Sequence, residues 1–184
     1  MELLQTPRLL LRKLTHEVYQ QVFTSYTGEE LKTFFGCRSN EELEEERKKY
    51  TDGLSMYRKA CLVFQLLEKE TNEVIGWCGY HTWYLPHYRA ELGYELNDDS
   101  KKGKGYMKEA LAAILDYGFT TMGLKRVEAF LDLENIPSLR LIQYFGFTQE
   151  GTLREHYFTN GRFEDSTVFS LLHKEYQPKL APLL

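Results

Sequence analysis

The 184-residue sequence has few cysteines, prolines and tryptophans, and no long run of apolar residues. Its three cysteines, Cys37, Cys61 and Cys78, lack the spacing of metal ligands, and an odd number cannot all pair as disulfides within one chain. No apolar run approaches the roughly 20 residues that a membrane-spanning helix needs. The first residues lack the basic and then apolar profile of a secretion signal. We therefore predict a cytoplasmic protein with free thiols and no membrane contact.

Positive charge is also scarce. Lysine and arginine number 23 against 27 acidic residues, which gives a net charge of −4 at pH 7. Proteins that hold nucleic acid by electrostatic attraction need a basic face, so we predict no direct contact with nucleic acid. The histidines show neither the HxxxH nor the HExxH spacing of metal ligands, so we also predict no metal site.

The composition of the sequence predicts one folded domain. Apolar residues make up 42% of the chain and aromatic residues 14%, which is typical of a packed core rather than a disordered chain. We find no repeat, no low-complexity tract and no linker rich in Pro, Gly or Ser. We predict a single domain over residues 1–184.

The spacing of apolar residues predicts a mixed α/β order. Strands are expected at residues 9–14, 60–67, 74–80, 90–96, 126–131, from 147 onward and at 163–172. Helices are expected at residues 16–26, 39–57, 105–121 and 137–144.

Two of these segments carry further predictions. The strands at 90–96 and 126–131 flank one helix, and the right-handed crossover rule makes them parallel neighbours. Asn160 and Gly161 predict a turn before the last strand. That strand looks exposed, which would favour self-association as a homodimer.

An acidic run at residues 41–46 opens the helix expected over 39–57, and Ser39 with Glu42 fits a capping box. Two interpretations of the run stay open. It is either a solvated helix face or an acidic lip that attracts a basic peptide.

The segment Lys101-Lys102-Gly103-Lys104-Gly105 joins the strand that ends near Leu96 to the helix expected from residue 105. The N-terminus of a helix offers unpaired backbone N–H groups to an anion. Glycines let that backbone approach a phosphate without a Cβ in the way. The two glycines alone are equally compatible with a plain helix-entry turn. Between a strand and a helix, however, the loop predicts binding of a pyrophosphate.

Six short motifs are spaced along nearly the whole chain. They are Thr6-Pro7-Arg8-Leu9-Leu10-Leu11-Arg12, Gly103-Lys104-Gly105-Tyr106-Met107-Lys108-Glu109-Ala110-Leu111, Asn135-Ile136-Pro137-Ser138, Gly146-Phe147, Glu150-Gly151-Thr152-Leu153-Arg154 and Asn160-Gly161-Arg162-Phe163-Glu164-Asp165. Together they resemble the GNAT (GCN5-related N-acetyltransferase) superfamily, and in particular its ribosomal-protein alanine N-acetyltransferase branch. The glycine loop departs from the superfamily form at one position, where Ser100 replaces a glutamine or arginine.

This resemblance implies a GNAT-like fold of the α/β (α+β) class. It is a mixed, mostly antiparallel twisted sheet of six to seven strands, splayed between strands 4 and 5 and flanked by about four helices. The resemblance also implies acetyl-CoA as cosubstrate, without a metal. The cofactor-binding residues that it implies are Tyr94, Glu95, Leu96, Lys101, Lys102, Gly103, Lys104, Gly105, Tyr106, Asn135 and Ser138.

The resemblance further implies where the catalytic groups lie. Backbone N–H groups from Tyr94 to Leu96 would polarise the thioester carbonyl. Many relatives carry a tyrosine acid seven residues after the motif asparagine, but that position holds Ile142 here. Ser138 is then the candidate proton relay, unless its side chain only satisfies the first helical turn. Asn135 either contacts the cofactor or caps that helix.

A base must deprotonate the acceptor amine. Glu95, Glu91 and Glu155 are candidates, directly or through water, and Glu91 and Glu95 share one strand face by parity. The glutamate base of the branch falls at Tyr157, which could orient the substrate instead. We therefore predict Ser138, Glu95 and Asn135 as catalytic residues and His81, Trp83, Glu91 and Tyr157 as lining of the acceptor pocket. Each pocket residue could instead be a packing residue.

The resulting prediction is an acetyl-CoA-dependent N-acetyltransferase that acts on the N-terminal amine of a protein or peptide. One alternative is an N-acetyltransferase for a small amine, such as an antibiotic, a polyamine or an amino acid. An alternative of another class is a non-catalytic acyl-CoA-binding regulatory module. The departures at Ile142 and Tyr157 keep that alternative open.

Overall fold

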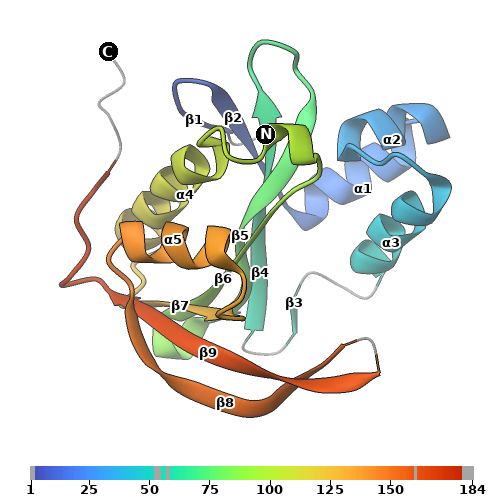
Figure 1. The fold of residues 1–184 in the computed structure, drawn as a ribbon. Helices are drawn as coiled ribbons and strands as arrows, with labels where there is room; N and C mark the ends of the chain where they lie inside the picture. Colours follow the sequence, from blue (N-terminus) through green and yellow to red (C-terminus); the bar gives the residue numbers. More distant parts are fainter. Residues whose placement is uncertain (1–2, 52–54, 57–58, 160, 180–184) are drawn as a thin grey trace.

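The computed structural model describes residues 3–51, 55–56, 59–159 and 161–179 (Figure 1). None of the described helices is long and apolar enough to cross a membrane. The elements in chain order are β1 (Leu3–Gln5), β2 (Leu9–Leu14), α1 (His16–Ser25), α2 (Gly28–Phe35), α3 (Asn40–Thr51), β3 (Ser55–Met56), β4 (Lys59–Glu68), β5 (Val74–Tyr84), η1 (Leu85–His87), β6 (Arg89–Leu96), η2 (Asp99–Lys101), α4 (Tyr106–Asp116), η3 (Tyr117–Thr121), β7 (Arg126–Leu131), α5 (Ile136–Tyr144), β8 (Thr148–Thr159) and β9 (Arg162–Leu172).

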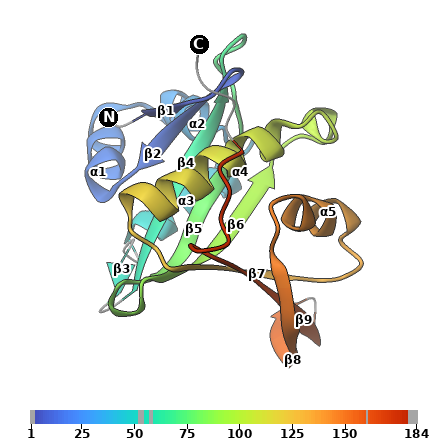
Figure 2. The same ribbon diagram turned by 90° about the vertical axis from the view of Figure 1, so that its left-hand side faces the viewer.

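Within the described residues, nine strands form one sheet in the order β1-β2-β4-β5-β6-β7-β9-β8, with β3 paired to β4. Strands β6 and β7 are parallel, and the other pairs are antiparallel. The β6–β7 register ends where Glu91 lies opposite Glu128, and beyond it the two strands diverge (Figure 2). The predicted mixed, mostly antiparallel sheet and its splay between residues 90–96 and 126–131 are therefore confirmed.

The sheet separates two hydrophobic clusters. Helix α4 buries Leu111, Ile114 and Leu115 in the larger cluster, against alternate residues of β2, β4, β5 and β6. Helices α1 to α3 form the second cluster, which includes Leu31 and Phe35. Figure 2 shows α4 in front of the sheet and α3 behind it. The even-numbered side chains of β6 therefore face α4, and the odd-numbered ones face away from it.

The last turn of the predicted 105–121 helix is not α-helical. Tyr117–Thr121 form a π-helical turn. The hydroxyl of Tyr80 donates a hydrogen bond of 2.9 Å to the carbonyl of Ile114. A Cβ on Gly118 would lie 2.1 Å from that hydroxyl oxygen, so glycine is needed there. The phenol inserted beside this helical carbonyl accompanies the wider turn.

The structure has more elements than the six to seven strands and about four helices that we predicted. Strands β1 and β3 have three and two residues, too short for an alternating pattern to be recognised. Helix α2 was missed although its signals are present. Thr27 and Glu30 form a capping box at its start, and Gly36 ends it in the left-handed conformation at φ 73°.

The helix predicted over 39–57 ends early, at Thr51. Residues 55–56 form β3 instead, and residue 57 lies outside the described residues. The capping box predicted at the start of this helix, at Ser39 and Glu42, is half formed. The N–H of Glu42 donates to the Ser39 hydroxyl, but the Glu42 carboxylate accepts from the N–H of Arg38 rather than that of Ser39. Leu43 is the buried residue of this acidic helix, so little packing is present to extend it.

The predicted exposure of the strand at 163–172 is wrong. Strand β9 lies between β7 and β8, and residues such as Phe169 and Leu171 are buried. The exposed edge is β8, whose twelve residues are all exposed. Of the predicted turn, Asn160 lies outside the described residues, and Gly161 has the left-handed φ of 80° that such a turn needs.

Candidate active site

The glycine loop has the geometry of an anion site. Gly103 has φ 71°, and Gly105 has φ 82° and is the N-cap of α4. Both angles are in the region that favours glycine. A Cβ on Gly103 would meet no atom within 4 Å, so open space lies above this backbone. The first N–H groups of α4, an eleven-residue helix, are therefore free to bind a phosphate.

The start of the chain holds this loop in place. Glu109, in the first turn of α4, accepts hydrogen bonds from the Thr6 hydroxyl at 2.5 Å and from the backbone N–H of Arg8 at 2.7 Å. The Arg8 guanidinium donates to Glu109 and to the carbonyl of Lys104. Burial raises the pKa of Glu109, but the bonds from Thr6 and Arg8 lower it on balance. The motif at residues 6–12 and the motif at residues 103–111 thus form one structural unit.

Several side chains predicted to bind the cofactor are paired with protein carboxylates. The ammonium groups of Lys101 and Lys102 each lie 2.6 Å from a carboxylate oxygen, of Glu68 and Asp99 respectively. The Tyr106 hydroxyl also donates to Glu68. Lys104 has no carboxylate at ion-pair distance among the described residues. Backbone N–H groups and Lys104 are therefore the anion-binding groups that the loop offers.

The splay exposes one edge of β6. Tyr94, Glu95 and Leu96 pair with β5, at Cys78, Trp77 and Gly76 respectively, but lie beyond the last β6–β7 pair. Within the described residues, this part of β6 has no strand on its other side. Backbone groups from Tyr94 to Leu96 can therefore bind a thioester carbonyl or a pantetheine amide.

One buried hydroxyl in this region has no well-aligned hydrogen-bond partner among the described residues. The Tyr94 hydroxyl is buried, and no described residue forms a well-aligned hydrogen bond with it. Burial raises the pKa of Tyr94, and the nearby Ser138 hydroxyl opposes that rise without completing the bond. A buried, unpaired hydroxyl is costly, so its presence fits a ligand that would bind it. The loop, the open β6 edge and Tyr94 together fit the pyrophosphate and pantetheine arm of a coenzyme A thioester.

Asn135 and Ser138 lie at the start of α5. The Asn135 side chain accepts a hydrogen bond from the N–H of Ser138 at 3.2 Å, so Asn135 caps the helix, which was one of its two predicted roles. The Ser138 hydroxyl lies close enough to the Tyr94 hydroxyl to affect its pKa. Ile142 is fully buried in the core and cannot serve as an acid.

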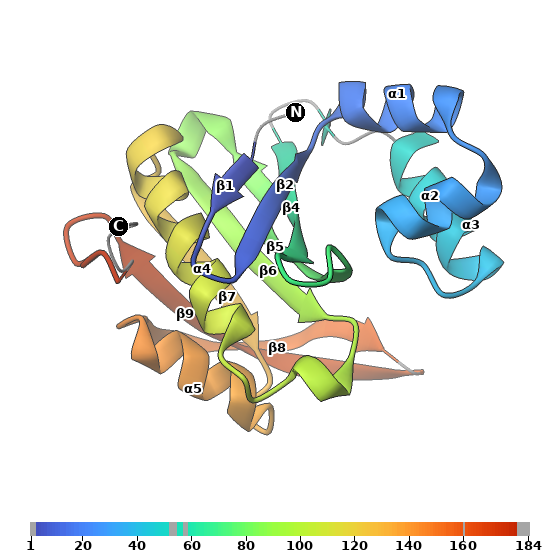
Figure 3. The same cartoon turned by 90° about the horizontal axis from the view of Figure 1, so that it is seen from above.

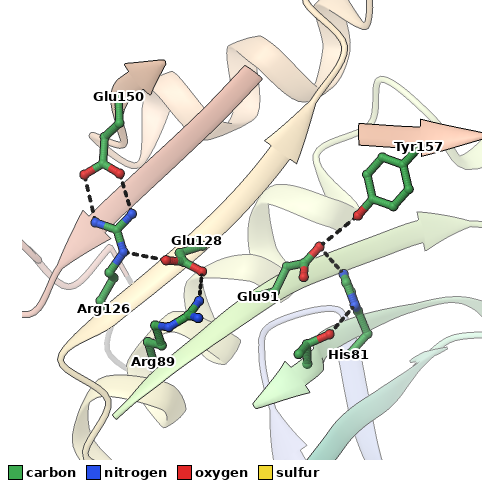
Figure 4. A network of polar contacts seen from close by, with 8 residues as sticks. His81, Arg89, Glu91, Arg126, Glu128, Glu150 and Tyr157 are labelled. Atoms are coloured by element: carbon green, nitrogen blue, oxygen red, sulfur yellow. Dashed lines mark hydrogen bonds and ion pairs between the residues drawn. The ribbon is translucent and has the colours of Figure 1, made fainter. Parts of the chain in front are cut away.

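The odd-numbered side chains of β6 form a second set of polar groups, on the face away from α4. Glu91 accepts a hydrogen bond of 3.3 Å from the Tyr157 hydroxyl, and Nε2 of His81 lies at the same distance from the same carboxylate oxygen (Figure 4). Glu95 accepts a hydrogen bond from Nε1 of Trp77, also at 3.3 Å. The predicted common face of Glu91 and Glu95 is confirmed.

Gly93 makes this arrangement possible. A Cβ at Gly93 would lie 2.4 Å from the His81 ring and 2.8 Å from the Trp77 ring. Both rings therefore lie directly over the β6 backbone between Glu91 and Glu95. Sequence reasoning missed this residue, although a glycine inside a strand is a signal of close approach. Trp83, by contrast, lies opposite Ala90 and packs against the α4-side core.

A cavity of about 720 Å³ lies over this face. Its floor includes Trp77, His81 and Glu95, and Tyr19 and Phe35 form part of its wall. Three carboxylates of the acidic run, Glu42, Glu45 and Glu46, also line it. The acidic run is therefore not only a solvated helix face. Sequence reasoning did not connect it to Trp77 and His81, because no local pattern tells on which side of the sheet α3 packs.

Other motif residues have structural roles. Arg126 of β7 binds both Glu128 and Glu150, which links β7 to β8 (Figure 4). The hydrogen bonds from Arg126 lower the pKa of Glu150 to about 2. Asp165 accepts a hydrogen bond of 2.8 Å from the N–H of Glu155, which lies in a bulge of β8 with φ 52°. Glu155 is exposed and does not line the cavity.

Comparison with known proteins gives a consistent result. A family model described as an acetyltransferase (GNAT) domain matches residues 8–148. N-acetyltransferase p20 of Bacillus licheniformis, itself uncharacterized, is 36% identical over 178 residues, which cover 96% of this chain and 99% of that protein.

Two further matches carry named acceptors. A solved structure of a candidate ribosomal-protein-serine acetyltransferase from Vibrio cholerae is 26% identical, with a TM-score of 0.65 over 93% of this chain and 97% of that one. A spermidine N(1)-acetyltransferase of Vibrio cholerae is 33% identical over 75 residues, which are 41% of this chain and 43% of that enzyme.

Proposed function

The chain belongs to the acetyltransferase (GNAT) domain family and is an acyltransferase, and from this premise we propose that it transfers acetyl from acetyl-CoA to a primary amine bound in the acidic cavity. The observation that carries the proposal is the position of the cavity floor. Glu95 faces the cavity, and its neighbours Tyr94 and Leu96 lie on the open edge of β6 and face the α4 side. One short stretch of strand thus adjoins both candidate substrate sites.

The residues proposed to hold acetyl-CoA lie on the α4 side. Gly103, Gly105 and Lys104 bind the pyrophosphate, and the β6 edge from Tyr94 to Leu96 binds the pantetheine arm and thioester. Ser138, beside Tyr94, relays a proton to the departing thiolate. Acetyl-CoA supplies the activated acetyl group, and the residues of the chain orient it against the amine.

The acceptor that we propose first is the N-terminal amine of a protein or peptide. It is supported by the motif resemblance and by the similarity to the candidate ribosomal-protein-serine acetyltransferase. Glu95 binds the positively charged amino group, and Glu42 and Glu45 attract basic residues of the peptide.

A small polycation, such as a polyamine, is the second candidate. The specific observation in its favour is the excess of carboxylates in the cavity. Glu42, Glu45, Glu46 and Glu95 line it, against Arg38 and Lys49. Lys49 is paired with Glu46 at 2.5 Å, and Arg38 lies 3.8 Å from Asp98. Among the described residues, Glu45 and Glu95 have no cation at ion-pair distance. Two separated carboxylates suit a ligand with two separated ammonium groups.

The test is thiol release from acetyl-CoA in the presence of a set of amines. The set comprises peptides with a free N-terminus, the same peptides with a blocked N-terminus, spermidine and an aminoglycoside. We expect turnover with free N-termini and none with their blocked forms. Turnover on spermidine alone would replace the first acceptor by the second. Tight CoA binding with no turnover on any amine would support the non-catalytic acyl-CoA-binding module instead.

Cytoplasmic location and homodimer formation remain proposals. The dimer would form through β8, the exposed edge strand, rather than through the strand at 163–172. Phe158 of β8 and Phe163 of β9 are 65% and 63% exposed, and their tilted rings have centroids 5.0 Å apart, which adds an apolar contact surface. Sedimentation of the full chain and of a Phe158→Ser variant tests this proposal.

A further inference from the structure

A histidine–carboxylate pair lies where β6 and β7 separate (Figure 4). Nε2 of His81 is 3.3 Å from Oε1 of Glu91. Glu91 is the last β6 residue that pairs with β7, and it is only 9% exposed. The pair therefore lies at the apex of the splay, beside the β6 edge to which we assign the thioester.

The backbone directs His81 to this position. Tyr80 pairs with Leu92 and Thr82 with Glu91, so His81 is the extra residue of a β-bulge in β5. Bulges redirect a side chain and are common beside active sites. The missing Cβ of Gly93 then leaves room for the imidazole to lie over β6. The bulge in β5 and Gly93 in β6 thus together set the position of the His81 side chain.

The groups around the His81 ring leave one nitrogen to accept a proton. Nε2 lies 3.3 Å from a carboxylate oxygen, which can only accept a hydrogen bond, so we place the proton of the neutral ring on Nε2. Nδ1 then carries the lone pair, 3.3 Å from the Thr82 hydroxyl. The Tyr157 hydroxyl donates to the same Glu91 oxygen and fixes the carboxylate. The His81 side chain is 38% exposed and lines the cavity, so an acceptor amine can reach it.

We propose that His81 is the base that deprotonates the acceptor amine and that Glu91 is a positioning residue that orients it. The inference rests on the proposed function. The acceptor ammonium gives a proton to Nδ1 of His81, and the resulting amine nitrogen bonds to the thioester carbon. The carbon–sulfur bond breaks with its electron pair going to sulfur. The second amine proton passes to the thiolate through Ser138, and His81 returns its proton to water.

Glu95 is better placed to bind charge than to remove a proton. It is exposed and accepts a hydrogen bond from Trp77, whereas Nδ1 of His81 holds a lone pair that can take a proton. Other charged or titratable groups also face His81. Glu91 of β6 lies beside it, and Tyr157 of β8 binds that carboxylate. The charged or titratable residues that line the cavity with His81 are Tyr19, Cys37, Arg38, Glu42, Glu45, Glu46, Lys49, Cys61 and Glu95.

The test compares pH–rate profiles of kcat/KM for the wild type, His81→Asn and Glu91→Gln. The acceptor is the peptide or spermidine, whichever the wild type acetylates. We expect His81→Asn to lower kcat by about 100-fold or more. It should also remove the acidic limb of the profile, which is the fall of kcat/KM at low pH. Glu91→Gln should shift that limb to lower pH, because a carboxylate beside the imidazolium is lost. Acceptor binding to His81→Asn, measured by calorimetry without acetyl-CoA, should stay within about twofold of the wild type.

Two variants serve as controls. His87→Asn changes an exposed histidine in η1, and Glu128→Gln removes the buried carboxylate opposite Glu91. Both should leave the acidic limb in place. If His81→Asn does not fold, His81→Gln takes its place.

A wild type without turnover would overturn the proposed function. A wild type with turnover, together with a His81→Asn profile that keeps its acidic limb and rate, would overturn this inference alone.

Discussion

Nζ of Lys101 lies 2.6 Å from Oε2 of Glu68, and this ion pair ties the glycine loop to the end of β4. Thr71 and Tyr106 donate hydrogen bonds to the same carboxylate. The hydrogen bonds, that from Lys101 first, lower the pKa of Glu68 to about 2. The loop proposed to bind phosphate is thus held from a different hairpin.

Glu68→Gln should weaken this attachment in a pH-dependent way. A carboxylate with a lowered pKa stabilises the fold fully above its unfolded pKa, near 4.5, and loses that effect as the pH falls toward 2. We expect the variant to melt about 3 °C below the wild type at neutral pH. The gap should close between about pH 4.5 and 2. Melting curves across this range check the prediction, with the exposed Glu70→Gln as control. A gap that does not change with pH would contradict it.

Gly103→Ala should impair binding of CoA more than it impairs folding. The left-handed conformation costs a residue with a Cβ about 1–2 kcal/mol. Gly123 has nearly the same φ, 68° against 71°, and both glycines have open space above them. Gly123→Ala is therefore a matched control for backbone strain. We expect similar losses of unfolding free energy, but a fall in CoA affinity for Gly103→Ala only. Equal CoA affinities in calorimetry would rule out the loop as the phosphate site.

Tyr94→Phe should stabilise the ligand-free protein. Its buried hydroxyl lacks a well-aligned partner, and removal of such a group avoids a desolvation cost of about 1 kcal/mol. If the Tyr94 hydroxyl forms a hydrogen bond with bound acetyl-CoA, the Tyr94→Phe variant binds acetyl-CoA less tightly. We expect a higher melting temperature without ligand and a smaller rise on adding acetyl-CoA. A lower melting temperature without ligand would show that the hydroxyl is already satisfied.

Glu45→Gln should raise the KM for a cationic acceptor and leave kcat nearly unchanged. Glu45 lines the cavity without a cationic partner among the described residues, whereas Glu44, one residue earlier, faces outward and pairs with Arg47 at 3.4 Å. A partly exposed pair contributes up to about 1 kcal/mol, so we expect a two- to fivefold rise. Salt should reduce the difference. Glu44→Gln is the matched control, and an equal rise in both variants would exclude a specific role for Glu45.

Parts of the site that depend on local geometry could be predicted from sequence. Gly103 and Gly105 stand between a strand and a helix, and the strand period puts Glu91 and Glu95 on one face. Contacts between distant segments could not be predicted in this way. Nothing near Tyr106 indicates that its hydroxyl binds Glu68 rather than a ligand. The role of the acidic run depends on how α3 packs over the sheet, which is a tertiary property.

The sheet has a consequence for the order of substrate binding. The proposed acetyl-CoA groups lie on the α4 face and the acidic cavity lies on the α3 face, and β6, which pairs with β7 only up to Glu91, borders both. A molecule on one face does not block entry to the other. Both substrates can therefore be bound at once, and neither product has to leave before the second substrate arrives. Initial-rate plots should intersect rather than run parallel, and CoA should compete with acetyl-CoA but not with the amine.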